Sequence, residues 1–104
     1  MLRMRRILLA SLLVLPALAQ AAVPARPAKL GQCVACHGDN GRSRIPGTPH
    51  LAGQDERYLV QALGAYRSGS RRALPMNSIA NTLQPRDIAD LARWYALQPA
   101  GGVR

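Results

Sequence analysis

Two cysteines and a histidine stand close enough in the chain to hold one prosthetic group. Cys33, Cys36 and His37 lie in the sequence Cys-Val-Ala-Cys-His, which is the C-x-x-C-H signature of covalent haem attachment. Two thiols three residues apart share one face of a helical turn, so both can form thioethers with the vinyl groups of a haem. The adjacent imidazole then lies under the iron, and we expect His37 to be the proximal ligand.

Other chemistries of a cysteine pair fit this sequence less well. A redox disulfide of the thioredoxin type belongs in a βαβ context, and the residues around Cys33 and Cys36 have no such pattern. A structural zinc site needs four ligands, whereas the chain offers two cysteines and two histidines at a spacing unlike that of zinc fingers. The motif therefore predicts one haem c per chain, linked through both cysteines.

The second axial position of a haem iron can take a Met, a His, a Lys or no protein ligand. Met76 is the only methionine after residue 21, and it follows Pro75 in a segment without a helical pattern. A lone methionine often fills a core, but a thioether on the iron would stabilise the ferrous form and raise the potential. His50 is the rival ligand. We expect Met76 to bind the iron opposite His37.

Residues 1–21 have the pattern of a cleavable export signal. Three arginines precede a nearly unbroken apolar run over residues 7–19, which is shorter than the ~20 residues of a membrane span. The small residues Ala19 and Ala21 predict cleavage after Ala21, with cleavage after Ala19 or an uncleaved anchor as alternatives. We expect a periplasmic protein of a Gram-negative bacterium, without stable membrane insertion after cleavage.

Residues 22–104 then form a single domain of 83 residues. A chain of this length makes a marginal core, and small scaffolds usually need a disulfide, a metal or a cofactor as a staple. The chain has no Phe, and its aromatic residues are one Trp and three Tyr. A haem would supply the apolar volume that the side chains lack.

The domain is strongly basic. Residues 22–104 hold eleven Lys or Arg against five Asp or Glu, a formal charge of +6. Such a balance suits nucleic acid, anionic lipid or an acidic protein. Export argues against nucleic acid, and Arg71-Arg72 is the only adjacent basic pair in the domain. We therefore predict redox partner proteins with acidic docking surfaces, and a monomer in solution.

Hydrophobic periodicity predicts an all-α domain of about three short helices, with long loops wrapped around the haem. The helices are expected over residues 27–36, 55–69 and 85–98. The segments 38–54 and 70–84 between them are rich in turn residues or irregular. Loops of this length in a compact domain usually surround something functional.

The second and third of these helices carry end signals. Asp55 can cap the second helix and Gly69 can end it. Pro85 suits the first turn of the third helix, where Asp87 also favours the positive end of the helix dipole. One apolar face of that helix is predicted from Ile88, Leu91, Ala92 and Tyr95.

Five strings, taken in order, resemble class I cytochromes c, and most closely the small bacterial mono-haem domains of the cytochrome c4 kind. They are C-V-A-C-H-G at 33–38, P-H-L-A-G-Q at 49–54, R-Y-L-V-Q-A-L-G-A-Y-R-S-G at 57–69, M-N-S-I at 76–79 and D-I-A-D-L-A-R-W-Y at 87–95. Together they cover most of the chain after residue 21. The ordered series is more specific than the haem motif alone.

The resemblance implies a class I cytochrome c fold around one haem, with His37 and Met76 as axial ligands. In that family a loop proline offers its backbone carbonyl to the proximal imidazole, a role that would fall to Pro49. Such a bond fixes the tautomer and orientation of the ring. The resemblance also implies that Leu51 packs on the haem.

The family pattern further implies that Trp94 or Tyr95 packs the last helix against the first. The chain departs from the pattern in its short first helix after Pro27, and in Gln84, which stands where a Ser or Thr cap is usual. Ser78 also replaces a common Gly after the methionine. None of these departures touches an expected haem ligand.

These features predict a carrier of single electrons and not an enzyme. The sequence has no carboxylate pair and no nucleophile with a base, and an iron with both axial positions filled has no open site. The main alternative is a dedicated haem c subunit of a periplasmic dehydrogenase or oxidase complex. A haem sensor or peroxidase-like enzyme with an open sixth position, and a thiol oxidoreductase without haem, are the remaining alternatives.

Overall fold

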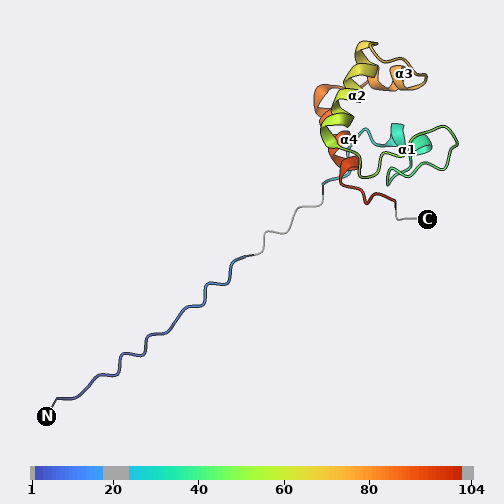
Figure 1. Cartoon of the computed structure of the whole chain (residues 1–104). Coiled ribbons are helices and arrows are strands. Elements are labelled where there is room, and N and C mark those ends of the chain that lie inside the picture. The colour runs from blue at the N-terminus through green and yellow to red at the C-terminus, as the bar shows by residue number, and fades with distance from the viewer. Residues whose placement is uncertain (1, 18–23, 102–104) are drawn as a thin grey trace.

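The computed structural model describes residues 2–17 and 24–101. Within these ranges the chain forms helices and no strand, which confirms the predicted all-α class. The helices are α1 (Gly31–His37), α2 (Glu56–Ser68), α3 (Met76–Asn81) and α4 (Pro85–Ala96). Residues 2–17 run as an extended chain away from the helices (Figure 1). No helix of the described part is long and apolar enough to cross a membrane. Both expected cleavage positions, Ala19 and Ala21, lie outside the described residues.

The prediction that segment 70–84 is irregular is wrong, because this segment contains α3, which brings the helices to four where about three were expected. A helix of six residues is too short to give a clear periodic pattern and is not stable alone. It packs against α2, and its Ala80 is fully buried. Tertiary packing therefore stabilises a helix that the local sequence would not stabilise alone.

The first helix also begins later than predicted. Residues 28–30 form a turn, in which the Leu30 amide donates to the Pro27 carbonyl at 3.1 Å, and α1 follows from Gly31 through His37. The helix ends at Gly38, whose φ of 79° favours glycine. The result is a helix of two turns that carries both cysteines and the histidine.

The end signals of α2 and α4 act as predicted. Asp55 Oδ1 accepts from the Tyr58 amide at 2.8 Å, and Gly69 ends α2 in the left-handed conformation. Pro85 opens α4, and an Asp87 carboxylate oxygen accepts from the Gln84 amide at 2.9 Å. Asp87 thereby binds the amide at the N-cap of α4, where Gln84 stands in place of the usual Ser or Thr.

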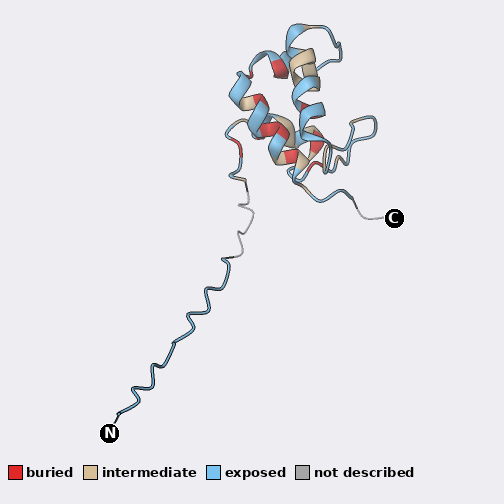
Figure 2. Ribbon diagram, turned by 60° about the vertical axis from the view of Figure 1, so that its left-hand side comes forward, coloured by how far each residue is buried: buried red, intermediate tan, exposed pale blue. Residues whose placement is uncertain are grey.

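The core lies where α2, α4 and the chain before α1 meet. Helix α2 packs against both α3 and α4, and the buried residues, red in Figure 2, lie largely on the helices. The buried apolar residues of the described chain are Leu30, Leu59, Ala80, Leu83, Ile88, Leu91, Ala92 and Tyr95. The predicted apolar face of α4 is thus confirmed. Few side chains form this core for a domain of this length, and a bound group would add apolar contacts to it.

Gly41 closes the loop between α1 and α2. Its carbonyl accepts from the Leu51 amide at 2.7 Å and from the Ala52 amide at 3.1 Å. Its φ is +76°, and a Cβ built on it would lie 2.6 Å from Ala52 N and 2.9 Å from Tyr95 Cδ1. Close approach of two backbone segments therefore requires glycine at this position.

Replacing Gly41 by Ala is expected to lower the free energy of unfolding by about 3 kcal/mol, the sum of backbone strain and overpacking. Gly47→Ala is the matched control, because Gly47 has a φ of +83° but nothing within 4 Å of its added Cβ. It is expected to cost about 1 kcal/mol, from backbone strain alone. Urea unfolding of both variants measures the difference, and equal losses would show that the close approach at Gly41 is unimportant.

Candidate haem-binding site

Helix α1 places the two cysteines on one face, one turn apart. Both thiols are free and half-buried, without a disulfide between them. Burial raises the pKa of the Cys33 thiol, so this group is protonated at neutral pH. A thiol oxidoreductase needs the opposite shift, toward a stable thiolate. The raised pKa of Cys33 therefore does not favour redox exchange at this position.

The His37 imidazole is buried and held by a loop carbonyl. Only 8% of the residue is exposed, and Nδ1 lies 3.0 Å from the carbonyl oxygen of Pro49. Because a carbonyl can only accept, Nδ1 must carry the proton in this contact, and Nε2 keeps its lone pair. This is the tautomer that an iron ligand requires. The contact between Pro49 and the imidazole has the form that the family resemblance implied.

The loop that contains Pro49 is stabilised by hydrogen bonds within the loop. The exposed His50 accepts from the Ser43 amide through Nδ1 at 2.9 Å, and the Thr48 amide donates to the Ile45 carbonyl at 3.1 Å. His50 Nδ1 is thus used inside the loop. This arrangement stabilises the turn beside Pro49, and it gives His50 a role that does not involve the iron.

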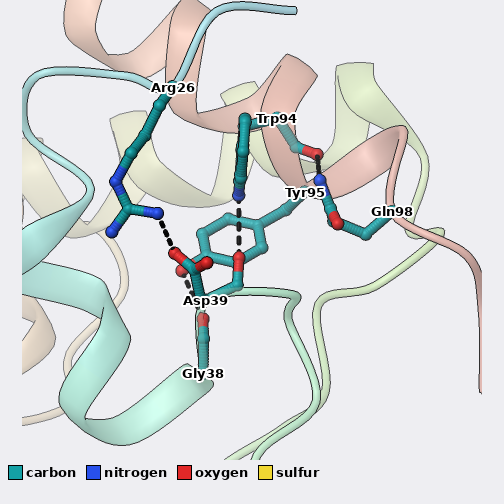
Figure 3. A network of polar contacts seen from close by, with 6 residues as sticks. All are labelled: Arg26, Gly38, Asp39, Trp94, Tyr95 and Gln98. Atoms are coloured by element: carbon teal, nitrogen blue, oxygen red, sulfur yellow. Dashed lines mark hydrogen bonds and ion pairs between the residues drawn. The ribbon is translucent and has the colours of Figure 1, made fainter. Parts of the chain in front are cut away.

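The end of α4 holds the chain directly after His37 (Figure 3). The Tyr95 hydroxyl donates to the Gly38 carbonyl at 3.0 Å, and Trp94 Nε1 donates to the Asp39 carbonyl at 2.8 Å. Asp39 also pairs with Arg26. Burial is the main cause that raises the pKa of Tyr95, so its hydroxyl remains a donor at all ordinary pH values. The last helix is thereby bonded to the turn that ends the first.

Leu51 and Met76 stand on different parts of the fold. Leu51 is half-buried and packs against the core, in the same loop as Pro49. Met76 is half-buried in the first turn of α3, and Figure 1 places α3 near the end of α2, whereas α1 lies near its beginning. The structure thus groups Cys33, Cys36, His37 and Pro49, and it places Met76 on a separate element.

Asn77 is a residue of this region that the sequence analysis does not single out. It follows Met76 directly, and its side chain makes three hydrogen bonds with the backbone of the α2–α3 region. An Asn side chain near the start of a helix readily bonds to nearby backbone groups. Which partners it takes depends on tertiary structure and cannot be found from the sequence.

The donor groups fit a haem c. Two free thiols on one helical turn, an imidazole with an unprotonated Nε2 and a half-buried thioether are the groups that such a haem uses. In the described ranges, no three His, Cys, Asp or Glu side chains gather as they would around a metal ion. The zinc alternative therefore has no support from the described side chains.

Comparison with known proteins decides the family. The family model for cytochrome c matches residues 25–95. The chain belongs to the cytochrome c family. This cytochrome c carries covalently bound haem c, and the spacing of Cys33 and Cys36 fits the two thioether bonds. Its class I fold agrees with the resemblance found in the sequence.

Three relatives of this cytochrome c are 37–44% identical to it over the aligned stretch. Cytochrome c4 of Pseudomonas aeruginosa is 43% identical over an alignment of 96 residues that covers 88% of this chain and 48% of that protein. Cytochrome c-554(548) of Halomonas halodenitrificans is 44% identical over an alignment of 73 residues that covers 67% of this chain and 88% of that protein. A thiosulfate dehydrogenase electron acceptor of Thiomonas intermedia is 37% identical over an alignment of 101 residues that covers 94% of this chain and 46% of that protein.

Solved structures agree with these relatives. Reduced recombinant cytochrome c4 of Pseudomonas stutzeri superposes with a TM-score of 0.67 at 34% identity, covering 76% of this chain and 46% of that one. Cytochrome c4 of Acidithiobacillus ferrooxidans gives a TM-score of 0.59 at 32% identity over 62% of this chain and 37% of that one. This cytochrome c spans about half the length of the cytochrome c4 proteins that it matches.

Proposed function

We propose that this cytochrome c carries single electrons in the periplasm, through one haem ligated by His37 and Met76. The observation that carries the proposal is the hydrogen bond between His37 Nδ1 and the Pro49 carbonyl, which leaves Nε2 free for the iron. The bound haem supplies one-electron chemistry between its ferric and ferrous states. In this proposal residues 1–21 are removed as an export signal, and residues 22–104 form the haem domain.

The role of the protein in this function is to hold the haem and its ligands in one geometry. Pro49 fixes the ring of His37, and a carbonyl acceptor on Nδ1 makes the imidazole a better donor to iron. Tyr95 and Trp94 hold the chain after His37 in place, so the ring does not need to reorient when the charge on the iron changes. Two filled axial positions leave no site for substrate, and the proposed function is therefore not enzymatic.

A basic surface beside the methionine segment supports acidic redox partners. Residues 57–86 contain five arginines and no Asp or Glu. Arg72 is exposed in the α2–α3 loop, and next to it Leu74 leaves 85% of its surface exposed. Brief redox encounters use small interfaces, whose complementary charges speed association. An acidic partner surface would complement this loop.

The carrier proposal is tested on protein loaded with haem in the periplasm of an expression host. We expect one haem per chain, a monomer on a sizing column, and a rate of electron exchange with an acidic flavodoxin that falls as salt rises. Arg72→Glu should slow this exchange about tenfold at low salt and leave it unchanged at high salt. Arg93→Glu makes the same charge change on α4 and is the matched control. Equal effects of the two variants would exclude docking at the α2–α3 loop.

The second candidate function is a haem c subunit of a periplasmic oxidoreductase complex. It is favoured by the similarity to the thiosulfate dehydrogenase electron acceptor of Thiomonas intermedia, which extends over 94% of this chain. A subunit would co-purify with a larger protein from its native host and would lose solubility alone. A free monomer that exchanges electrons on its own would contradict this second candidate.

A further inference from the structure

The side chain of Asn77 joins three points of the backbone. Its Nδ2 donates to the Tyr66 carbonyl and to the Arg71 carbonyl, at 2.8 Å each, and its Oδ1 accepts from the Ala73 amide at 2.9 Å. Tyr66 belongs to α2, and the other two partners belong to the loop that leads to α3. One half-buried amide group therefore ties the end of α2, the loop and the start of α3 together.

The hydrogen bonds of Asn77 stabilise the α2–α3 loop, which buries little of its own surface. The last carbonyls of a helix have no partner within the helix, and the Tyr66 carbonyl finds its partner in Asn77. The loop itself is open to solvent, since residues 70–75 are all exposed. A few other bonds hold it, such as the one from the Arg71 amide to the Ala65 carbonyl at 3.1 Å. Hydrogen bonds from Ser70 and Arg71 hold the first part of the loop to α2, and the side chain of Asn77 joins the loop to α3.

The same bonds set the position of Met76, because Asn77 is its neighbour in the first turn of α3. The Asn77 amide donates to the Ala73 carbonyl at 3.2 Å, so both the backbone and the side chain of Asn77 bind Ala73. Met76 belongs to the segment that these two bonds close between Ala73 and Asn77, so they restrain its backbone position.

We propose that Asn77 is a positioning residue, which holds the Met76 thioether against the haem iron by clamping the α2–α3 loop. This inference rests on the proposed ligation by Met76. The affinity of the ferric protein for an added ligand contains the free energy of opening this loop, because the added ligand must displace the thioether. Loss of the Asn77 bonds makes the opening easier, so added ligands should bind more tightly.

The test is titration of the oxidised, haem-loaded protein with imidazole, followed by the loss of the near-infrared band of Met-ligated haem. We expect Asn77→Ala to bind imidazole about tenfold more tightly than the parent protein. Asn77→Asp has nearly the same volume but cannot donate to the two carbonyls when ionised. It should therefore bind imidazole at least as tightly as Asn77→Ala does.

Asn81→Ala is the matched control, since Asn81 is an exposed residue at the end of the same helix. Its imidazole affinity should equal that of the parent protein. Urea unfolding of all variants separates a general loss of stability from a local one. A fall in the unfolding midpoint without any change in imidazole affinity would mean that Asn77 supports the fold alone, and would overturn the proposal.

Failure of the inference and failure of the proposed ligation give different results. If the parent protein lacks the near-infrared band and binds imidazole as tightly as Met76→Ala, then Met76 is not a ligand and both ideas fall. If the parent has the band but Asn77→Asp binds imidazole as weakly as the parent, only the role of Asn77 is wrong. Asn77→Ser keeps one hydrogen-bond donor, so the proposal predicts an imidazole affinity between those of the parent protein and Asn77→Ala. This variant replaces Asn77→Ala in the test if Asn77→Ala does not accumulate.

Discussion

Met76→Ala is expected to abolish the near-infrared band of the oxidised protein and to lower the reduction potential of the haem by on the order of 0.1 V. The thioether stabilises ferrous iron, so its removal favours the ferric state. Met76 is half-buried in the first turn of α3. Visible and near-infrared spectra with a redox titration provide the measurement.

Two control variants make this result specific. Ile79→Ala removes another half-buried apolar side chain from the same helix, and it should keep the band because it leaves the thioether in place. His50→Ala removes the rival ligand and should also keep the band, since His50 Nδ1 is bonded to the Ser43 amide. A band that survives in Met76→Ala, or that disappears in His50→Ala, would contradict ligation by Met76.

The second large effect concerns the two cysteines. Replacing both Cys33 and Cys36 by Ser is expected to give protein without covalent haem and without cooperative unfolding in urea. The described chain buries few apolar side chains, and its aromatic residues are four in number, so the polypeptide alone makes a marginal core. A haem attached through α1 supplies the missing apolar contact area.

Extraction with acidified acetone measures covalent attachment, because it removes free haem and leaves thioether-linked haem on the protein. Cys36→Ser alone should keep the haem on one thioether, with a shifted visible spectrum. Ala35→Ser adds a hydroxyl at the exposed position between the cysteines and should behave as the parent protein does. Cooperative unfolding of the double variant would show that the core is sufficient without haem.

The sequence predicts the helices well where local signals agree with tertiary contacts. Asp55 and Gly69 bound α2 as expected, and Pro85 opens α4, because caps and proline act through bonds within a few residues. Helix α3 was predicted as irregular chain, since six residues show no period. Helix α3 is instead stabilised by tertiary structure, because it packs against α2 and its Ala80 is fully buried.

In the candidate site, too, the residues with local sequence signals can be predicted, whereas those whose role depends on tertiary structure cannot. The motif of Cys33, Cys36 and His37 is local and can be recognised directly in the sequence. The family resemblance predicts the role of Pro49, whose carbonyl oxygen lies 3.0 Å from His37 Nδ1. Asn77 could not be found in this way. Its three partners lie four to eleven residues earlier, on two different elements, and nothing in the residue types specifies them. The placement of Met76 as a ligand remains a prediction that spectroscopy tests.

The bonds from α4 to the turn after His37 bear on the order of assembly. Trp94 and Tyr95 stand 55 and 57 residues after their acceptors, Asp39 and Gly38. Contacts of such separation form late, because the intervening chain must first give up its conformational freedom. A chain that emerges N-terminus first therefore presents both thiols long before the segment that locks the histidine turn. Until the last helix docks, the cysteine helix is therefore accessible in the partly folded chain.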